Sequence, residues 1–107
     1  MPMQKDGLDR FRAKIFYALS DPIRLKIIEY LRNGEKCVCE IIPYIKMPQP
    51  IVSRHLKILK DSGLLKDRKD GTRRFYSITD RRVFNIIDTV SPEVTESLSG
   101  HAIEQII

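Results

Sequence analysis

The hydrophobic period of this chain changes at Gly63, and this change constrains the fold more than any other feature. Before Gly63, apolar residues recur at the three- and four-residue spacing of helices, whereas residues 64–69 and 72–78 are short extended stretches. Asp70-Gly71 between these stretches is a strong signal for a two-residue hairpin turn. The sequence therefore predicts a series of helices followed by an antiparallel hairpin.

Helices are also expected on both sides of this hairpin. Asp21 can cap the second helix, Pro22 suits its first position, and Gly34 provides a stop. The third helix is expected to be broken or bent near Pro43, and Pro48-Gln49-Pro50 predicts a turn before the fourth. The expected helices span residues 8–19, 22–33, 37–45, 51–62 and 80–90, with a last helix within 91–107.

Two helices joined by a tight turn and followed by a basic hairpin form a winged helix-turn-helix. We therefore predict a mostly helical α+β fold with four helices, a two-stranded wing and one or two C-terminal helices. The 107 residues contain no repeat and no linker, so a single domain over 1–107 is expected. Its core spans about 8–90, and 91–107 adds a C-terminal helix.

The positive charge of the chain is concentrated in one segment. The chain has 19 basic and 14 acidic residues. Eight of the basic residues and three of the acidic residues lie between Arg54 and Arg74, which leaves eleven of each in the rest of the chain. All of the net charge of +5 therefore lies in 21 residues, which is typical of proteins that bind a polyanion. A solvated charged face is the alternative interpretation.

The fourth helix separates into two faces on a helical wheel. Val52, Leu56 and Leu59 fall on the side expected to face the core, whereas Ser53, Arg54 and Lys57 fall on the other. The outward side chains can reach base edges in a major groove, unless this is only the exposed face of a structural helix. The predicted DNA-binding residues of this helix are Gln49, Ser53, Arg54 and Lys57. Those of the hairpin, expected on flanking phosphates or in the adjacent minor groove, are Arg68, Lys69, Arg73 and Arg74.

Several stretches together resemble the arsenical-resistance (ArsR/SmtB) repressors. They are Ala18-Leu19-Ser20-Asp21-Pro22-Ile23-Arg24-Leu25, Cys37-Val38-Cys39-Glu40-Ile41, Gln49-Pro50-Ile51-Val52-Ser53-Arg54-His55-Leu56, Ser62-Gly63-Leu64-Leu65, and Asp70-Gly71 followed by Phe75-Tyr76-Ser77-Ile78. The resemblance covers roughly residues 8–90. It implies a homodimer built from the first and fifth helices, a palindromic operator, and repression relieved when a metal or metalloid binds.

Cys37 and Cys39 are the only cysteines, and they correspond to the arsenic-sensor motif of that family. A pair separated by one residue predicts reduced thiols in the cytoplasm rather than a disulfide scaffold. Within a regular helix these positions point about 200° apart, so binding of one ion to both is expected to unwind the first turn. Unwinding would displace the DNA-reading helices. Two small buried hydrophobic residues are the alternative.

Thiolates favour soft ions, so the expected inducer is As(III) or Sb(III), with Cd(II) or Pb(II) next. Thiol oxidation or persulfide formation on the same scaffold is a further alternative. Some members of the family have a third cysteine three residues after the second, where this chain has Ile42. Water, a small thiol or a group from a partner chain would then complete the coordination. No cofactor is required.

A zinc site on the fifth helix, present in other members of the family, is not expected here. In one register its positions are Asp80, Arg82, Glu93 and Glu96, and in another Asp88, Val90, His101 and Glu104. Neither register supplies the complete His-rich set that zinc prefers. Pro48 also replaces the Ser or Thr that often caps the recognition helix in the family, which predicts a helix start held less firmly.

Other classes of function fit less well. A non-regulatory winged module that binds RNA or protein is one alternative, and an enzyme using Cys39 and His55 is another. Such an enzyme would lack an orienting acid and an oxyanion site, so the chain is not expected to be an enzyme. His55 lies beside the apolar side of the fourth helix and is expected to be structural. No apolar run approaches the roughly 18 residues of a membrane span, and Met1–Asp6 precedes no apolar region, so a cytoplasmic protein without a membrane partner is expected.

Overall fold

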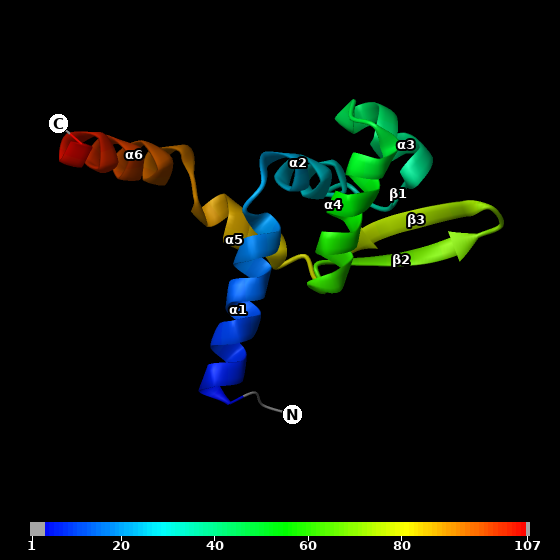
Figure 1. Ribbon diagram of the computed structural model, residues 1–107, viewed down its shortest axis with the longest axis horizontal. Coiled ribbons are helices and arrows are strands. Elements are labelled where there is room, and N and C mark those ends of the chain that lie inside the picture. Colours follow the sequence, from blue (N-terminus) through cyan, green and yellow to red (C-terminus); the bar gives the residue numbers. More distant parts are fainter. Residues whose placement is uncertain (1–3, 107) are drawn as a thin grey trace.

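The computed structural model describes residues 4–106, in which four helices precede the hairpin and two follow it (Figure 1). The elements are α1 (Lys5–Leu19), α2 (Pro22–Tyr30), β1 (Lys36–Cys37), α3 (Val38–Ile45), α4 (Gln49–Asp61), β2 (Leu65–Asp70), β3 (Arg73–Ile78), α5 (Val83–Thr89) and α6 (Pro92–Ile106). This order confirms the predicted winged helix-turn-helix. The expected domain of 1–107 includes Met1–Met3 and Ile107, which lie outside the described residues, so its bounds remain a prediction.

The predicted helix boundaries at Asp21 and Gly63 have clear physical causes. The Asp21 carboxylate accepts hydrogen bonds from the backbone N–H groups of Ile23 (2.8 Å) and Arg24 (3.2 Å), which caps α2. At the end of α4 the chain turns through Gly63, whose φ of +84° is a left-handed conformation that favours glycine. There the N–H of Leu64 donates to the carbonyl of Leu59, closing the helix and directing the chain into the wing.

The hairpin is part of a three-stranded antiparallel sheet in the order β1-β3-β2. Strands β2 and β3 pair from Leu65↔Ile78 to Asp70↔Arg73, so the two-residue loop is Gly71-Thr72, one residue later than predicted. The short β1 pairs Lys36 with Tyr76 and Cys37 with Phe75. It was not predicted, because a strand of two residues is too short to show an alternating pattern.

The core lies where α2, α3 and α4 meet the base of the wing. The predicted inward face of α4 is confirmed, because Val52, Leu56 and Leu59 are at most 2% exposed. They pack in one cluster with apolar residues of α2, α3, β2, β3 and α5, among them Ile27, Ile28, Ile41, Leu65, Tyr76 and Phe84. This packing fixes the rotation of α4, so its opposite face is directed to solvent.

Several helix boundaries differ from the prediction, among them the start of α1 at Lys5 instead of residue 8 and the end of α2 at Tyr30 instead of residue 33. Helix α3 continues through Pro43 without a break, and α4 begins at Gln49 instead of residue 51. Helix α5 begins at Val83 because Asp80 accepts a hydrogen bond from the backbone N–H of Arg82 (2.9 Å) in the preceding turn.

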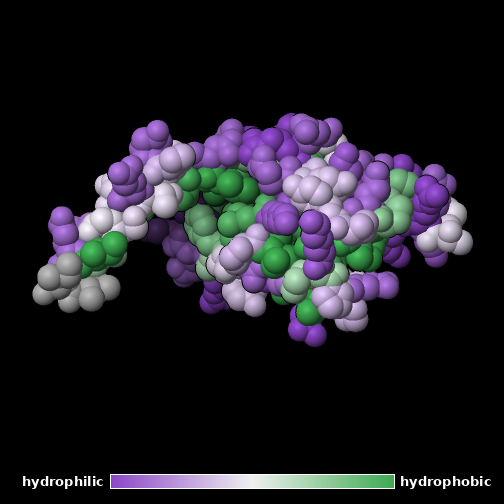
Figure 2. Space-filling model, turned by 90° about the horizontal axis from the view of Figure 1, so that it is seen from above, coloured by the Kyte–Doolittle hydropathy of each residue, from purple (hydrophilic) through white to green (hydrophobic). Residues whose placement is uncertain are grey.

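The ends of the chain project from the body. In Figure 1, α6 lies to one side and α1 extends away from the other helices. The radius of gyration is accordingly 16.1 Å, against about 13 Å for a compact domain of this length. Hydrophobic side chains gather beside the base of α6 (Figure 2), where Phe16, Ile86 and Val90 are 58%, 40% and 62% exposed. None of the described helices is long and apolar enough to cross a membrane.

Candidate nucleic-acid interface

The outer face of α4 carries the four residues predicted to contact DNA. Gln49, Ser53, Arg54 and Lys57 are all exposed, and Gln49 is the first residue of the helix. Ahead of it, Pro48 provides no side-chain cap, as its chemistry predicts, but its carbonyl accepts from the N–H groups of Ile51 (3.0 Å) and Val52 (3.1 Å). The helix therefore presents two neutral polar side chains, Gln49 and Ser53, and two positively charged ones, Arg54 and Lys57, on one exposed surface.

The wing carries the other four basic residues predicted to contact DNA, and they differ in their partners. Arg73 and Arg74 line one hollow together with Gln49 and Ser53. The Arg68 guanidinium forms two hydrogen bonds with the Glu35 carboxylate, at 2.7 and 2.9 Å, and lies over the Phe75 ring. The guanidinium of Arg74 is paired with Asp67. Within residues 4–106, Lys69 and Arg73 make no ion pair. These two side chains can therefore contact a phosphate without first breaking an ion pair with a carboxylate.

Asp67 joins the wing to the recognition helix. Its carboxylate pairs with Lys60 of α4 (3.0 Å) and with Arg74 of β3, and its side chain is only 10% exposed. Hydrogen bonds from Lys60 and Arg74 lower the pKa of this carboxyl, despite the opposing effect of burial. Asp67 thus stays ionised and fixes the wing against α4.

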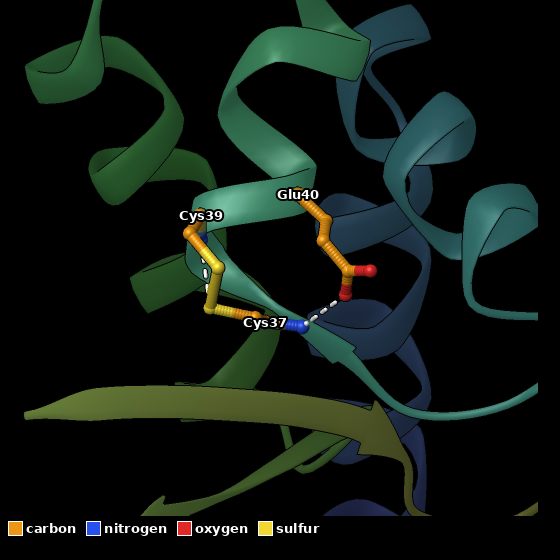
Figure 3. Close-up of a disulfide and its surroundings, with 3 residues drawn as sticks. All are labelled: Cys37, Cys39 and Glu40. Carbon is orange, nitrogen blue, oxygen red and sulfur yellow. Dashed lines mark hydrogen bonds between the residues drawn. A yellow bond between two sulfur atoms is a disulfide. The ribbon is translucent and has the colours of Figure 1, made fainter. Parts of the chain in front are cut away.

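The cysteine pair lies at the start of α3 (Figure 3). Cys37 ends β1 and is the extended residue that precedes the helix, while Cys39 is the second helical residue. Their Cα atoms are 5.0 Å apart and a disulfide joins them. The Cys37 sulfur accepts a hydrogen bond from the backbone N–H of Cys39 (3.0 Å), and the Glu40 carboxylate accepts one from the N–H of Cys37 (2.9 Å).

This geometry corrects two expectations. The sequence predicted reduced thiols, whereas the structure joins the sulfurs, since a Cα separation of 5.0 Å is within the usual range of disulfide pairs. The expected unwinding of the first turn is also unnecessary. Cys37 already lies outside the helix with φ −69° and ψ 146°, so the two side chains converge in the folded state. Cys37 is 3% exposed, but Cys39 is exposed and therefore accessible.

Once reduced, the pair would offer two sulfur donors to an ion. Among residues 4–106, no three His, Cys, Asp or Glu side chains come close enough together to hold a metal. Two carboxylates considered for a zinc site are engaged by guanidinium groups, Asp80 by Arg82 (2.6 Å) and Asp88 by Arg32 (2.9 Å). The hydrogen bonds from Arg82 lower the pKa of Asp80 to about 2.

The structure does not support a catalytic pair of Cys39 and His55. Nδ1 of His55 lies 3.2 Å from the Arg24 guanidinium, which leaves this ring nitrogen unavailable to a thiol. His55 is half-buried, in keeping with the structural role expected for it. Sequence reasoning missed Arg24, and the one available signal was a charged residue within the apolar second helix. It also missed the pairing of Cys37 with Phe75 of the wing, for which the sequence contains no signal.

Comparison with known proteins gives a consistent result. A family model described as "Bacterial regulatory protein, arsR family" matches residues 21–67. An uncharacterized HTH-type transcriptional regulator of Methanocaldococcus jannaschii is 53% identical over 79 residues, 73% of this chain and 89% of the relative. An arsenical resistance operon repressor of Staphylococcus aureus is 35% identical over 77 residues, 72% of this chain and 74% of the relative.

Solved structures agree with the sequence matches. The homodimeric winged helix-turn-helix DNA-binding domain of a possible ArsR-family regulator from Mycobacterium bovis superposes with a TM-score of 0.79 at 31% identity. The superposition covers 91% of this chain and 93% of that one. The match spans less of some relatives, such as 64% of a transcriptional repressor SmtB homolog from Synechocystis at 36% identity.

Proposed function

This chain belongs to the ArsR/SmtB family and is a DNA-binding transcriptional repressor, and on that basis we propose that Cys37 and Cys39 bind the inducer that releases it from DNA. The proposed inducer is a thiophilic metalloid, As(III) or Sb(III), with Cd(II) or Pb(II) as weaker candidates. The repressor acts in the cytoplasm as a homodimer on a palindromic operator. Exposed apolar residues of α1 and α5 and the homodimeric Mycobacterium bovis domain support the dimer.

DNA binding is assigned to the outer face of α4 and to the wing. Ser53 and Arg54 are proposed to read base edges in the major groove, with Gln49 beside them and Lys57 on a phosphate. On the wing, Lys69 and Arg73 contact flanking phosphates directly, whereas Arg68 and Arg74 exchange a carboxylate partner for a phosphate. The concentration of net positive charge in residues 54–74 supports this assignment.

The main support for a thiophilic inducer is that the two sulfurs converge where α3 meets the wing. Cys37 is backbone-paired with Phe75 of β3 and also precedes α3, so an ion held by the pair would lie where α3 meets the wing. Thiolates form strong bonds with soft ions. The arsenical resistance operon repressor among the relatives agrees with this choice.

A redox-responsive repressor is the second candidate, and the disulfide between Cys37 and Cys39 favours it. In this version an oxidant takes two electrons from the two thiols, the S–S bond forms, and a reductant restores DNA binding. Both versions use the same pair of sulfurs. They differ in whether an ion or an oxidant releases the DNA.

Titration of labelled DNA distinguishes the candidates. A duplex enriched from a random pool by the protein itself is bound under a phosphine reductant, and arsenite is added to the wild type and to the Cys37→Ser and Cys39→Ser variants. We expect both variants to retain DNA affinity and to lose release by arsenite, since one thiolate alone is outcompeted by water. Release of either variant by arsenite would exclude the dithiol sensor. The oxidant is added in a separate titration without reductant, and release of the wild type there but not by arsenite under reductant would establish the redox candidate.

A further inference from the structure

A cavity of about 400 Å³ lies directly beside the cysteine pair. Cys37 and Cys39 line it on the α3 side, and Gln49 and Ser53 line it on the α4 side. Its remaining wall is the wing, including Arg73 and Arg74. In Figure 1 the start of α3, the helix α4 and the hairpin meet around β1. The cysteine pair therefore lines the same space as several residues proposed to contact DNA.

The cavity lies where the sugar-phosphate backbone of bound DNA is expected to pass. In a winged helix-turn-helix the recognition helix enters the major groove and the wing reaches a neighbouring stretch of the duplex. The sugar-phosphate strand that separates them must then pass between α4 and the hairpin, where the cavity opens. Arginine and serine side chains are ordinary phosphate ligands. The cavity thus has soft donors on one side and phosphate-binding groups on the other.

An ion held by the two sulfurs would need a further ligand, and the open space beside the pair is this cavity. Trivalent arsenic takes three ligands, and no third metal-ligating side chain stands near the pair within the described residues. Because both cysteines line the cavity, it offers open space for a third substituent on arsenic. A substituent there occupies the volume between Ser53 and Arg73 that the DNA strand would use.

We propose that this cavity is one site for two mutually exclusive ligands, a dithiol-bound trivalent arsenical and the DNA backbone. Induction is then direct competition, and no rearrangement of α3 or α4 is needed because Cys37 already lies outside the helix. The inference rests on the proposed thiol sensor and adds where and how the inducer acts. Competition means that the protein cannot hold both ligands at once, so no ternary complex forms.

Phenylarsine oxide is the appropriate probe because it needs no third protein ligand. Its arsenic keeps the bond to the phenyl carbon and forms two As–S bonds, while the oxide oxygen leaves as water with the two thiol protons. No electron is transferred, and a phosphine reductant keeps the thiols free without competing as a thiol. The bulky phenyl group projects into the cavity.

The rate of DNA dissociation separates competition from allostery. Protein bound to labelled duplex is mixed with an excess of unlabelled duplex, with and without phenylarsine oxide. Competition predicts an unchanged dissociation rate constant, and an apparent Kd for DNA that rises in proportion to the probe concentration. An allosteric ligand would speed dissociation, and the rise in apparent Kd would level off, typically after about 5–150-fold. Faster dissociation or a plateau would overturn the shared site and leave the thiol sensor standing.

Binding of the probe to free protein is measured separately by native mass spectrometry. One arsenical per chain is expected for the wild type and none for Cys37→Ser or Cys39→Ser. Failure of the wild type to bind would overturn the thiol sensor itself, and this inference with it. The two failures are therefore distinguishable.

A second measurement avoids arsenic altogether. N-ethylmaleimide alkylates the exposed Cys39 of the reduced protein, and the rate is compared with and without saturating duplex. If DNA covers the cavity, we expect the duplex to slow this reaction. An Arg54→Ala, Arg73→Ala double variant that no longer binds the duplex is the control, because added DNA should leave its rate unchanged. Equal rates for the wild type with and without DNA would contradict the shared site.

Discussion

The guanidinium of Arg24 in α2 lies 3.2 Å from Nδ1 of His55 in α4. The same guanidinium donates to the carbonyls of Ala18 (2.7 Å) and Tyr17 (3.1 Å) at the end of α1. Arginine can only donate, so Nδ1 of His55 accepts and Nε2 carries the ring hydrogen. Arg24 is 6% exposed and connects the end of α1 to the recognition helix through the interior.

Replacing Arg24 by Ala should therefore destabilise the fold strongly. It removes three hydrogen bonds, including the one to the carbonyl of the buried Ala18, which we expect to cost about 3 kcal/mol of unfolding free energy. Urea unfolding at one fixed protein concentration measures the loss. Arg12→Ala is the matched control, because Arg12 pairs with Asp9 at an exposed site where such pairs contribute about 0–1 kcal/mol. Equal losses in the two variants would contradict the linking role of Arg24.

Asp67 should make stability depend on pH at the acid end. Because hydrogen bonds from Lys60 and Arg74 lower its pKa, its contribution is complete above the ordinary value of 3.8 and is lost as pH falls through the lowered value. Asp67→Asn should unfold at lower urea than the wild type at pH 7, and the difference should shrink below pH 3.8. Asp61→Asn is the control, since Asp61 pairs with Lys57 at an exposed site. A difference between Asp67→Asn and the wild type that persists undiminished at low pH would show that the pairing is not responsible.

Much of the fold could be predicted because the sequence patterns are local. Spacing of apolar residues, the Asp21 cap and the Gly63 stop are set within a few residues, and all three agree with the structure. The strand β1 could not be predicted, because its pairing with β3 joins residues about forty positions apart. The turn at Gly71-Thr72 differs by one residue because the ladder extends to Asp70↔Arg73.

Prediction of the candidate site was limited in the same way. The wheel of α4 places Ser53 and Arg54 on an exposed face, since burial of one helix face fixes the other. Sequence spacing could not show that Cys37 stands outside the helix, because one residue decides whether the two sulfurs diverge or converge. Nor could it show that Glu35 pairs with Arg68, a contact between residues distant in sequence.

Charged substitutions in the apolar surface beside α6 should break the dimer. Phe16 of α1 and Val90 after α5 are about 60% exposed in the single chain, which is unfavourable for large apolar side chains in water. Phe16→Glu or Val90→Glu should raise the dimer dissociation constant by about tenfold or more. Sedimentation measures this change, and Asn33→Glu adds the same charge to an exposed loop as a control. A wild type that sediments as a monomer would exclude the proposed dimer.

Binding to DNA should weaken steeply as salt rises. Each basic side chain that neutralises a phosphate releases counterions, so a plot of log K against log salt should be linear with a slope of about −0.9 per phosphate contact. Fluorescence anisotropy across a salt series measures the slope, and stoichiometric titration should give two chains per duplex. One chain per duplex, or affinity independent of salt, would contradict the symmetric electrostatic mode of binding.

Base reading and phosphate contact should separate between α4 and the wing. Arg54→Ala should cost about 1–3 kcal/mol on the selected duplex and little on random DNA, because a bidentate contact to a base is lost. Arg54→Lys retains the charge but not the planar fork, so it should also lose discrimination. In contrast, Arg73→Ala should weaken selected and random DNA alike and reduce the salt slope by about 0.9. Arg68→Ala should have a smaller effect than Arg73→Ala, because Glu35 already occupies its guanidinium. If Arg73→Ala changed sequence preference while Arg54→Ala did not, the wing rather than α4 would be the element that reads the bases.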